Sequence, residues 1–162
     1  MSIRTDIGKF FRGFKYAFEG LAFCIRTQRN FRSHLGTGAL VLWGSRICGT
    51  EGTQKLILLV CIGGVLALEA VNTAVENTVD LISGEERTKL GKAAKDCAAG
   101  AVLVFSVFAA AVGCAVFFNG RSLERIGAYF TGSPLRIAAA AGACVLQLVW
   151  VFVCFRDKPK DK

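Results

Sequence analysis

A run of 22 residues without a charge extends from Cys97 to Phe118. At 1.5 Å per residue, a helix of that length covers about 33 Å, and the hydrocarbon core of a bilayer is about 30 Å thick. A soluble domain of this size has little room to bury such a helix on all sides. The run therefore predicts a helix that crosses a membrane, and the mean hydropathy of the chain, +0.47, supports that interpretation.

Three further segments could also cross a bilayer, at about 35–48, 56–82 and 137–155. The segment at 35–48 is short, and Gly44 and Arg46 weaken it. The segment at 137–155 has 19 residues, of which only Gln147 is strongly polar, and this is just long enough to span. We therefore predict an all-α integral membrane protein with four spans.

The segment from Ile7 to Thr27 alternates aromatic and charged residues. Its apolar residues recur at helical spacing, and charged residues interrupt them. This pattern is typical of an amphipathic helix that lies on the membrane with its phenylalanine face in the acyl boundary. A polar loop with scattered aromatic residues is the alternative.

The positive charge of the chain flanks the apolar runs instead of forming a separate polar domain. The net charge is +8, which fits an anionic membrane surface better than nucleic acid, and we expect no nucleic-acid partner. With four spans and a cytoplasmic N-terminus, fifteen Lys and Arg residues face the cytoplasm and five face outward. The positive-inside rule therefore predicts that both termini are cytoplasmic.

The segment from Leu68 to Asp80 carries the most unusual chemistry. At 100° per residue its polar side chains fall within a stripe about 100° wide on one helix face. These side chains belong to Glu69, Asn72, Thr73, Glu76 and Asp80. A carboxylate inside a bilayer costs about 2.5–3.5 kcal/mol on insertion scales, so three on one stripe predict a polar cleft. A solvated extension of the helix could explain Asp80 but explains Glu69 poorly, because thirteen uncharged residues precede it.

A second charged cluster, with Lys89, Lys92, Lys95 and Asp96, precedes the run at 97–118. Lys89 and Lys92 fit an ordinary basic membrane flank. We expect the Asp96 carboxylate to meet Asp80 and Glu76 across a helical hairpin. Carboxylates with a lysine suit Mg²⁺ and a polyphosphate, because the metal prefers oxygen ligands and the phosphates need a cation. The sequence contains neither a P-loop nor a glycine-rich kinase loop.

Three motifs resemble those of the prokaryotic diacylglycerol kinase and undecaprenol kinase family. They read E-A-V-N-T-A-V-E-N-T-V-D at 69–80, K-A-A-K-D-C-A-A-G-A-V at 92–102 and N-F-R-S-H at 30–34. The resemblance implies an interfacial helix with three membrane helices in residues 1–118, and a trimer with shared active sites in a bacterial cell membrane. Residues 119–162 would add a connection, the extra span and a basic tail.

The resemblance also implies roles for individual residues. Members of the family transfer the γ-phosphate of ATP to a lipid hydroxyl, with Mg²⁺. Glu69 would be the catalytic base, Glu76 would hold the metal, and Asp80 would support the site. The nucleotide would meet Tyr16, Asn72, Glu76, Lys95 and Asp96.

Position 28 departs from the family pattern, which usually has a glutamate there as a second metal ligand. Here the residue is Gln28, and an amide is a weaker ligand for Mg²⁺ than a carboxylate. The wording N-F-R-S-H is closer to undecaprenol kinases, so we expect undecaprenol as the substrate. Diacylglycerol is the alternative lipid, and a non-catalytic membrane relative is the alternative from another class.

Overall fold

The computed structural model describes residues 3–84, 86 and 88–153. Within these residues the chain forms six helices and no strand, so the predicted all-α class is confirmed. The helices are α1 (Ile3–Thr27), α2 (Arg29–Ile47), α3 (Gly52–Ser83), α4 (Lys89–Phe117), α5 (Gly120–Thr131) and α6 (Pro134–Phe152).

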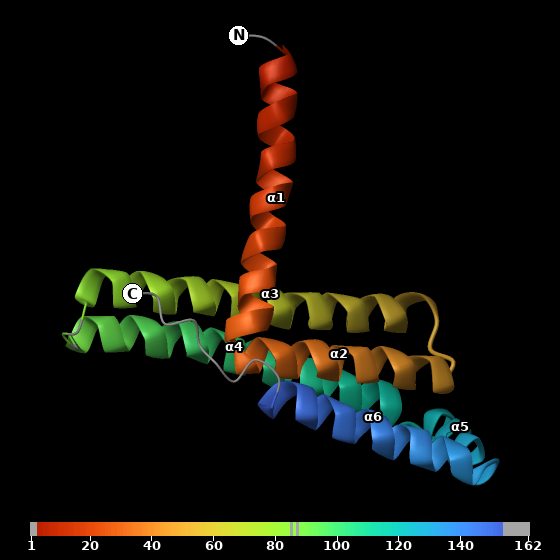
Figure 1. Cartoon of the computed structure of the whole chain (residues 1–162). Coiled ribbons are helices and arrows are strands. Elements are labelled where there is room, and N and C mark those ends of the chain that lie inside the picture. Colours follow the sequence, from red (N-terminus) through yellow and green to blue (C-terminus); the bar gives the residue numbers. More distant parts are fainter. Residues whose placement is uncertain (1–2, 85, 87, 154–162) are drawn as a thin grey trace.

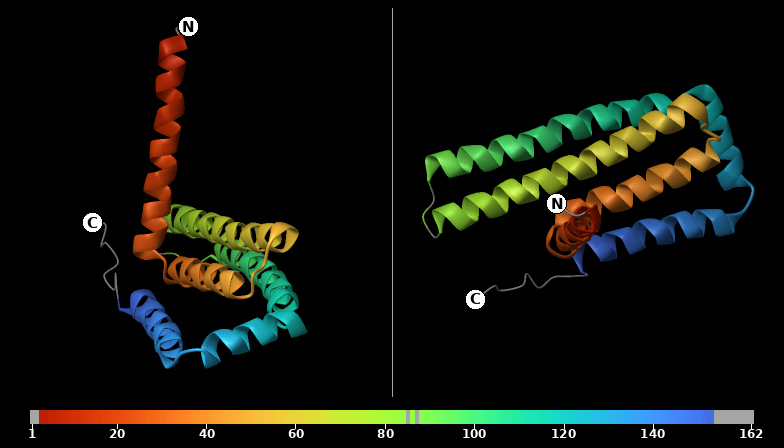
Figure 2. Two further views of the ribbon diagram at one scale, coloured as in Figure 1. Left: turned by 90° about the vertical axis from the view of Figure 1, so that its right-hand side faces the viewer. Right: turned by 90° about the horizontal axis from the view of Figure 1, so that it is seen from above.

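Four of the helices lie side by side in one curved layer. Seen from above, their order is α4, α3, α2, α6, and the contacts between neighbours follow the same order (Figure 2). The α3–α4 pair packs most extensively. A Cβ atom at Gly64 of α3 would lie 2.4 Å from the Phe105 ring of α4, so the absence of a side chain there allows the close approach.

Three helices in the described part of the chain are long and apolar enough to cross a membrane. They are α3, α4 and α6, and α6 covers the predicted C-terminal span at 137–155 as far as Phe152. Residues 154 and 155 of that predicted span, and the basic tail, lie outside the described residues. The first predicted span, at 35–48, falls in α2, which begins earlier, at Arg29. Helix α2 is not among the three apolar helices, because its arginine and other polar residues lower its mean hydropathy.

The layer of α2, α3, α4 and α6, over the length that α2 and α6 cover, is called the slab below. At 1.5 Å per residue, the 19 residues of α2 and the 19 of α6 each cover about 28 Å. The uncharged part of α3, from Leu56 to Leu68, covers about 20 Å in the same way. The values for α2 and α6 are close to the thickness of a hydrocarbon core, so α2 is long enough to lie beside α3 and α6 over that thickness.

Helix α1 runs across the direction of the layer (Figure 1). Its last turns contact α2 and α3, and Cys24 lies against Thr73 of α3. An axis across the spans is what an interfacial helix needs, and Phe10, Phe14 and Phe18 are all more than half exposed on α1. Beyond Thr73, the α3–α4 hairpin continues past the level of α1.

Helix α6 is fastened to α2 by polar groups at one end of the slab. The Gln147 amide of α6 donates to the Thr37 hydroxyl at 3.2 Å. The buried Arg32 guanidinium donates to the Val151 carbonyl at 3.1 Å and to the Ile25 carbonyl of α1 at 2.9 Å. Arg32 therefore joins the C-terminal ends of α1 and α6, which stabilises the corner where α2 begins.

Candidate functional site

Glu69 occupies the centre of the polar stripe and is 4% exposed. Its Oε1 atom lies 3.4 Å from Nε2 of His34 on α2. Thr73, one turn later, is also buried, and its hydroxyl donates to the Glu69 carbonyl at 2.9 Å. The α2–α3 packing thus encloses a carboxylate at the end of the uncharged part of α3, with an imidazole as its neighbour.

The next turn of α3 supplies two more polar groups. The Asn72 amide nitrogen donates to Oε1 of Glu76 at 3.1 Å. The Asn72 side-chain oxygen is buried and has no hydrogen-bond partner. A buried amide oxygen without a donor carries a substantial desolvation cost, which a metal ion or a ligand donor would remove.

The outer end of the stripe meets α4 through one ion pair. The Lys95 ammonium binds the Asp80 carboxylate across the α3–α4 hairpin. Asp96 follows Lys95 by about 100° around the helix and is exposed. In the described part of the chain, Asp96 forms no hydrogen bond or ion pair. The hairpin therefore brings Lys95 to the stripe, and the expected contact of Asp96 with Asp80 and Glu76 is absent from the single chain.

Two of the predicted site residues form no side-chain hydrogen bond or ion pair with this cluster in the described part of the chain. Tyr16 is on the projecting part of α1 and is 63% exposed. Gln28 is the N-cap residue of α2, half-buried, and its side chain makes no capping hydrogen bond. Among the described residues, no three His, Cys, Asp or Glu side chains are close enough to hold a metal ion together.

His34 was not singled out by the sequence, since a lone histidine at an interface has many explanations. Its spacing from Glu69, 35 residues away on another helix, carries no pattern. Only the packing of α2 on α3 places its imidazole beside the buried carboxylate.

An apolar groove of about 460 Å³ extends from His34 through the slab. It is formed by α2, α3 and α4, begins at Ser33 and His34, and ends at Phe117 and Phe118. These ends lie near opposite ends of the helices that form the slab. The groove therefore offers an apolar path from within the membrane to His34, the neighbour of the buried carboxylate.

Known proteins are similar in sequence to the part of the chain that forms this site. The family described as prokaryotic diacylglycerol kinase matches residues 15–117. The undecaprenol kinase of Bacillus subtilis is 40% identical over 114 residues, 70% of this chain and 92% of that protein. The diacylglycerol kinase of Synechocystis sp. is 42% identical over 100 residues, 62% of this chain and 57% of that protein. No solved structure matches the chain significantly.

The matched residues include the polar stripe, the facing lysine and most of the groove. Helices α5 and α6 lie beyond the family match. The long apolar helices agree with a multi-pass membrane protein. The chain therefore belongs to the prokaryotic diacylglycerol kinase family, a family of membrane lipid kinases that use ATP.

Proposed function

We propose that the protein phosphorylates the hydroxyl of undecaprenol, with Glu69 as the catalytic base. The observation that carries this proposal is the burial of Glu69 beside His34, at the head of an apolar groove. In the reaction, the lipid oxygen forms a bond to the γ-phosphorus of ATP, and the bond between that phosphorus and the ADP oxygen breaks. The Glu69 carboxylate accepts the hydroxyl proton.

His34 orients the base in this proposal. The Nε2 atom lies 3.4 Å from the Glu69 oxygen, and with a proton on Nε2 the imidazole would hold the carboxylate toward α2, where the groove begins. The groove excludes water from the lipid hydroxyl, which limits hydrolysis of ATP in place of transfer. Lys95, held by Asp80 where the hairpin extends beyond the slab, provides a cation for the phosphates.

The residues of the stripe fit a magnesium ion shared with the nucleotide. Mg²⁺ is commonly held by one or two carboxylates together with substrate phosphates and water. The Glu76 carboxylate and the unpartnered Asn72 oxygen would hold it, with Gln28 as a third oxygen donor. When bound, the ion would neutralise negative charge on the phosphates.

The groove favours a long lipid chain over two short ones. It reaches from Ser33 to Phe118, which lie near the two ends of the slab. An acyl chain of diacylglycerol fills one leaflet, whereas a polyprenyl chain is long enough to continue across the bilayer centre. The match to the Bacillus subtilis undecaprenol kinase over 92% of that protein is consistent with this choice.

A side-by-side assay tests the substrate. The purified protein in vesicles receives γ-³²P-labelled ATP with undecaprenol and diacylglycerol at equal mole fractions. We expect undecaprenyl phosphate to form with the larger kcat/KM. Predominant formation of phosphatidic acid would favour diacylglycerol, and a lack of product from either lipid would favour a non-catalytic relative.

Gln28 provides a test of the metal site. The Gln28→Glu variant adds a carboxylate, so we expect a lower Mg²⁺ concentration for half-maximal activity, by about threefold or more, because Mg²⁺ binds carboxylates more tightly than amides. Gln54→Glu, at the other end of α3, is the matched control and should leave the Mg²⁺ dependence unchanged. An unchanged dependence in Gln28→Glu would place position 28 outside the metal site.

A trimer would explain why Tyr16 is exposed in the single chain. Its ring is exposed on the part of α1 that projects from the layer. In an assembly of three copies, α1 of one chain would bring Tyr16 to the nucleotide site of a neighbour. The large apolar side chains exposed on α4, such as Leu103 and Phe108, offer surface for contacts between copies or with lipid.

A further inference from the structure

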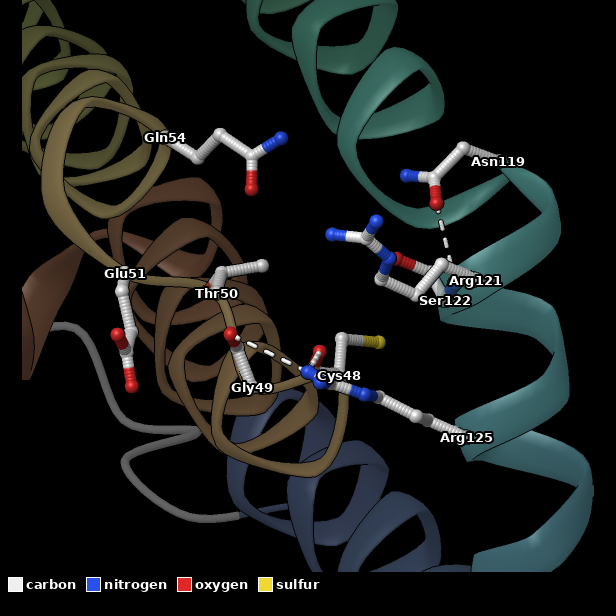
Figure 3. A pocket seen from close by; sticks show the side chains of 9 residues that line it. All are labelled: Cys48, Gly49, Thr50, Glu51, Gln54, Asn119, Arg121, Ser122 and Arg125. Atoms are coloured by element: carbon white, nitrogen blue, oxygen red, sulfur yellow. Dashed lines mark hydrogen bonds between the residues drawn. The ribbon is translucent and has the colours of Figure 1, made fainter.

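A polar pocket of about 600 Å³ lies at the end of the slab opposite the α3–α4 hairpin. Figure 3 shows the side chains that line it. The turn between α2 and α3 forms one wall, and the beginning of α5 forms the other. The pocket is more than 20 residues of α3 away from Asp80, so it is separate from the proposed kinase site. Its lining includes Arg121 and Arg125, one helical turn apart.

Arg125 is fixed in place by the turn between α2 and α3. Its Nη1 atom donates to the Cys48 carbonyl at 2.6 Å and approaches the Gly49 carbonyl at 3.4 Å. Gly49 has φ of 61°, and a Cβ atom there would lie 2.1 Å from Nη1. Glycine is therefore required for this contact. The contact holds the guanidinium at the pocket and leaves Nη2 without a partner among the described residues.

Arg121 has no hydrogen bond or ion pair within the described chain. Its guanidinium and the Gln54 amide reach into the pocket from opposite walls (Figure 3). The lining contains one acid, Glu51, whose carboxylate is turned away from Arg121 in the same view. Two guanidinium groups thus face one cavity with no carboxylate paired to either.

The other polar lining groups are already engaged. The Ser122 amide donates to the Asn119 side chain at 3.0 Å, and the Ser122 hydroxyl donates to the Val116 carbonyl at 3.0 Å. The Thr50 hydroxyl donates to the Ser45 carbonyl at 3.1 Å. Apart from the Glu51 carboxylate, which is turned away, the polar side chains that remain for a ligand are the two guanidinium groups and the Gln54 amide, and the guanidinium groups favour an anion.

The position of the pocket indicates which anion it meets. The ends of α2 and α4 and the start of α3 mark one edge of the slab, where lipid phosphates lie. Helix α5 has polar and apolar faces, and Leu123 is 48% exposed, as in helices that lie at the membrane interface. Arginine pairs bind phosphate oxygens with two parallel hydrogen bonds.

We propose that this pocket binds the phosphate of an anionic phospholipid between Arg121 and Arg125, at the membrane face opposite the kinase site. Both arginines lie beyond residues 15–117, so the family match does not include them, although the α2–α3 turn that holds Arg125 lies within it. Bound lipid would also reinforce the attachment of α5 to the α2–α3 turn.

Titration of the whole chain in a neutral detergent tests the proposal. Phosphatidylglycerol and phosphatidylcholine are added separately, and native mass spectrometry measures the fraction of protein with bound lipid. We expect tighter binding of phosphatidylglycerol. Arg121→Gln should weaken it about tenfold, the equivalent of about 1.4 kcal/mol, because a charge-assisted hydrogen bond is lost.

Two further variants separate the pocket from general charge. Arg136→Gln removes an arginine from the same membrane face whose guanidinium stacks on Tyr129 outside the pocket, and binding should be unchanged. Glu51→Gln removes the one acid of the lining and should strengthen binding. Equal weakening in Arg121→Gln and Arg136→Gln would overturn the proposal. Displacement of the lipid by micromolar inorganic phosphate would also overturn it, in favour of a free phosphate ligand.

Discussion

Replacing Glu69 by glutamine is expected to lower kcat by a factor of about 100 or more, while ATP still binds. A general base typically contributes 10²- to 10⁴-fold to the rate of the chemical step. The amide of glutamine has nearly the same shape as the carboxylate but cannot accept the hydroxyl proton. Because Glu69 is buried between α2 and α3, water cannot readily substitute for it as the base.

Phosphorylated lipid is measured as radiolabelled product, and nucleotide binding as fluorescence of an ATP analogue, on the same preparations. Glu124→Gln carries the same substitution on an exposed residue of α5 and is the matched control. We expect full turnover in that variant. Wild-type turnover in Glu69→Gln would show that another group takes the proton. Loss of both turnover and nucleotide binding would show that Glu69 acts on the nucleotide instead.

The buried part of the stripe was predictable from the sequence because its residues are neighbours on one helix. The 3.6-residue period fixes the relative directions of Glu69, Asn72 and Thr73 on α3, and all three are buried. Pairings between helices were harder to predict. A rotation of 100° separates Lys95 from Asp96, and the register of the hairpin decides which of them meets Asp80. Periodicity alone contains no information about that register.

Two helical features escaped the sequence interpretation for different reasons. Residues 120–131 belong to the predicted connection, but they form α5, and Asn119 caps this helix by accepting a 3.0 Å hydrogen bond from the Ser122 amide. The Asn-Gly pair at the start of this helix favours a turn, so the amphipathic pattern that follows is less apparent in the sequence. The predicted span begins at residue 35, whereas α2 begins at Arg29. Arg32 is buried because carbonyl groups at the ends of α1 and α6 accept its hydrogen bonds, which offsets the desolvation cost of the guanidinium group.

The two faces of the membrane are expected to label in opposite ways with an impermeant maleimide. Single cysteines are placed at Ser83, Thr131 and Lys160 after the seven native cysteines are replaced. In intact cells, position 131 should react, and positions 83 and 160 should be protected. Thr131 lies at the end of α5 and Ser83 at the tip of the hairpin, so they report opposite ends of the slab. Lys160 lies outside the described residues and reports the tail.

The reason for this expectation is the distribution of positive charge. Lys89, Lys92 and Lys95 belong to the hairpin end, and Arg156, Lys158, Lys160 and Lys162 follow the last span. Retention of such clusters in the cytoplasm sets the orientation of short loops. ATP is also cytoplasmic, so the end that carries Lys95 and Asp80 must face inward for the kinase to work. Permeabilised cells provide the control, because all three positions should then react. Labelling of position 160 in intact cells would show that the tail is external and that α6 does not cross the membrane.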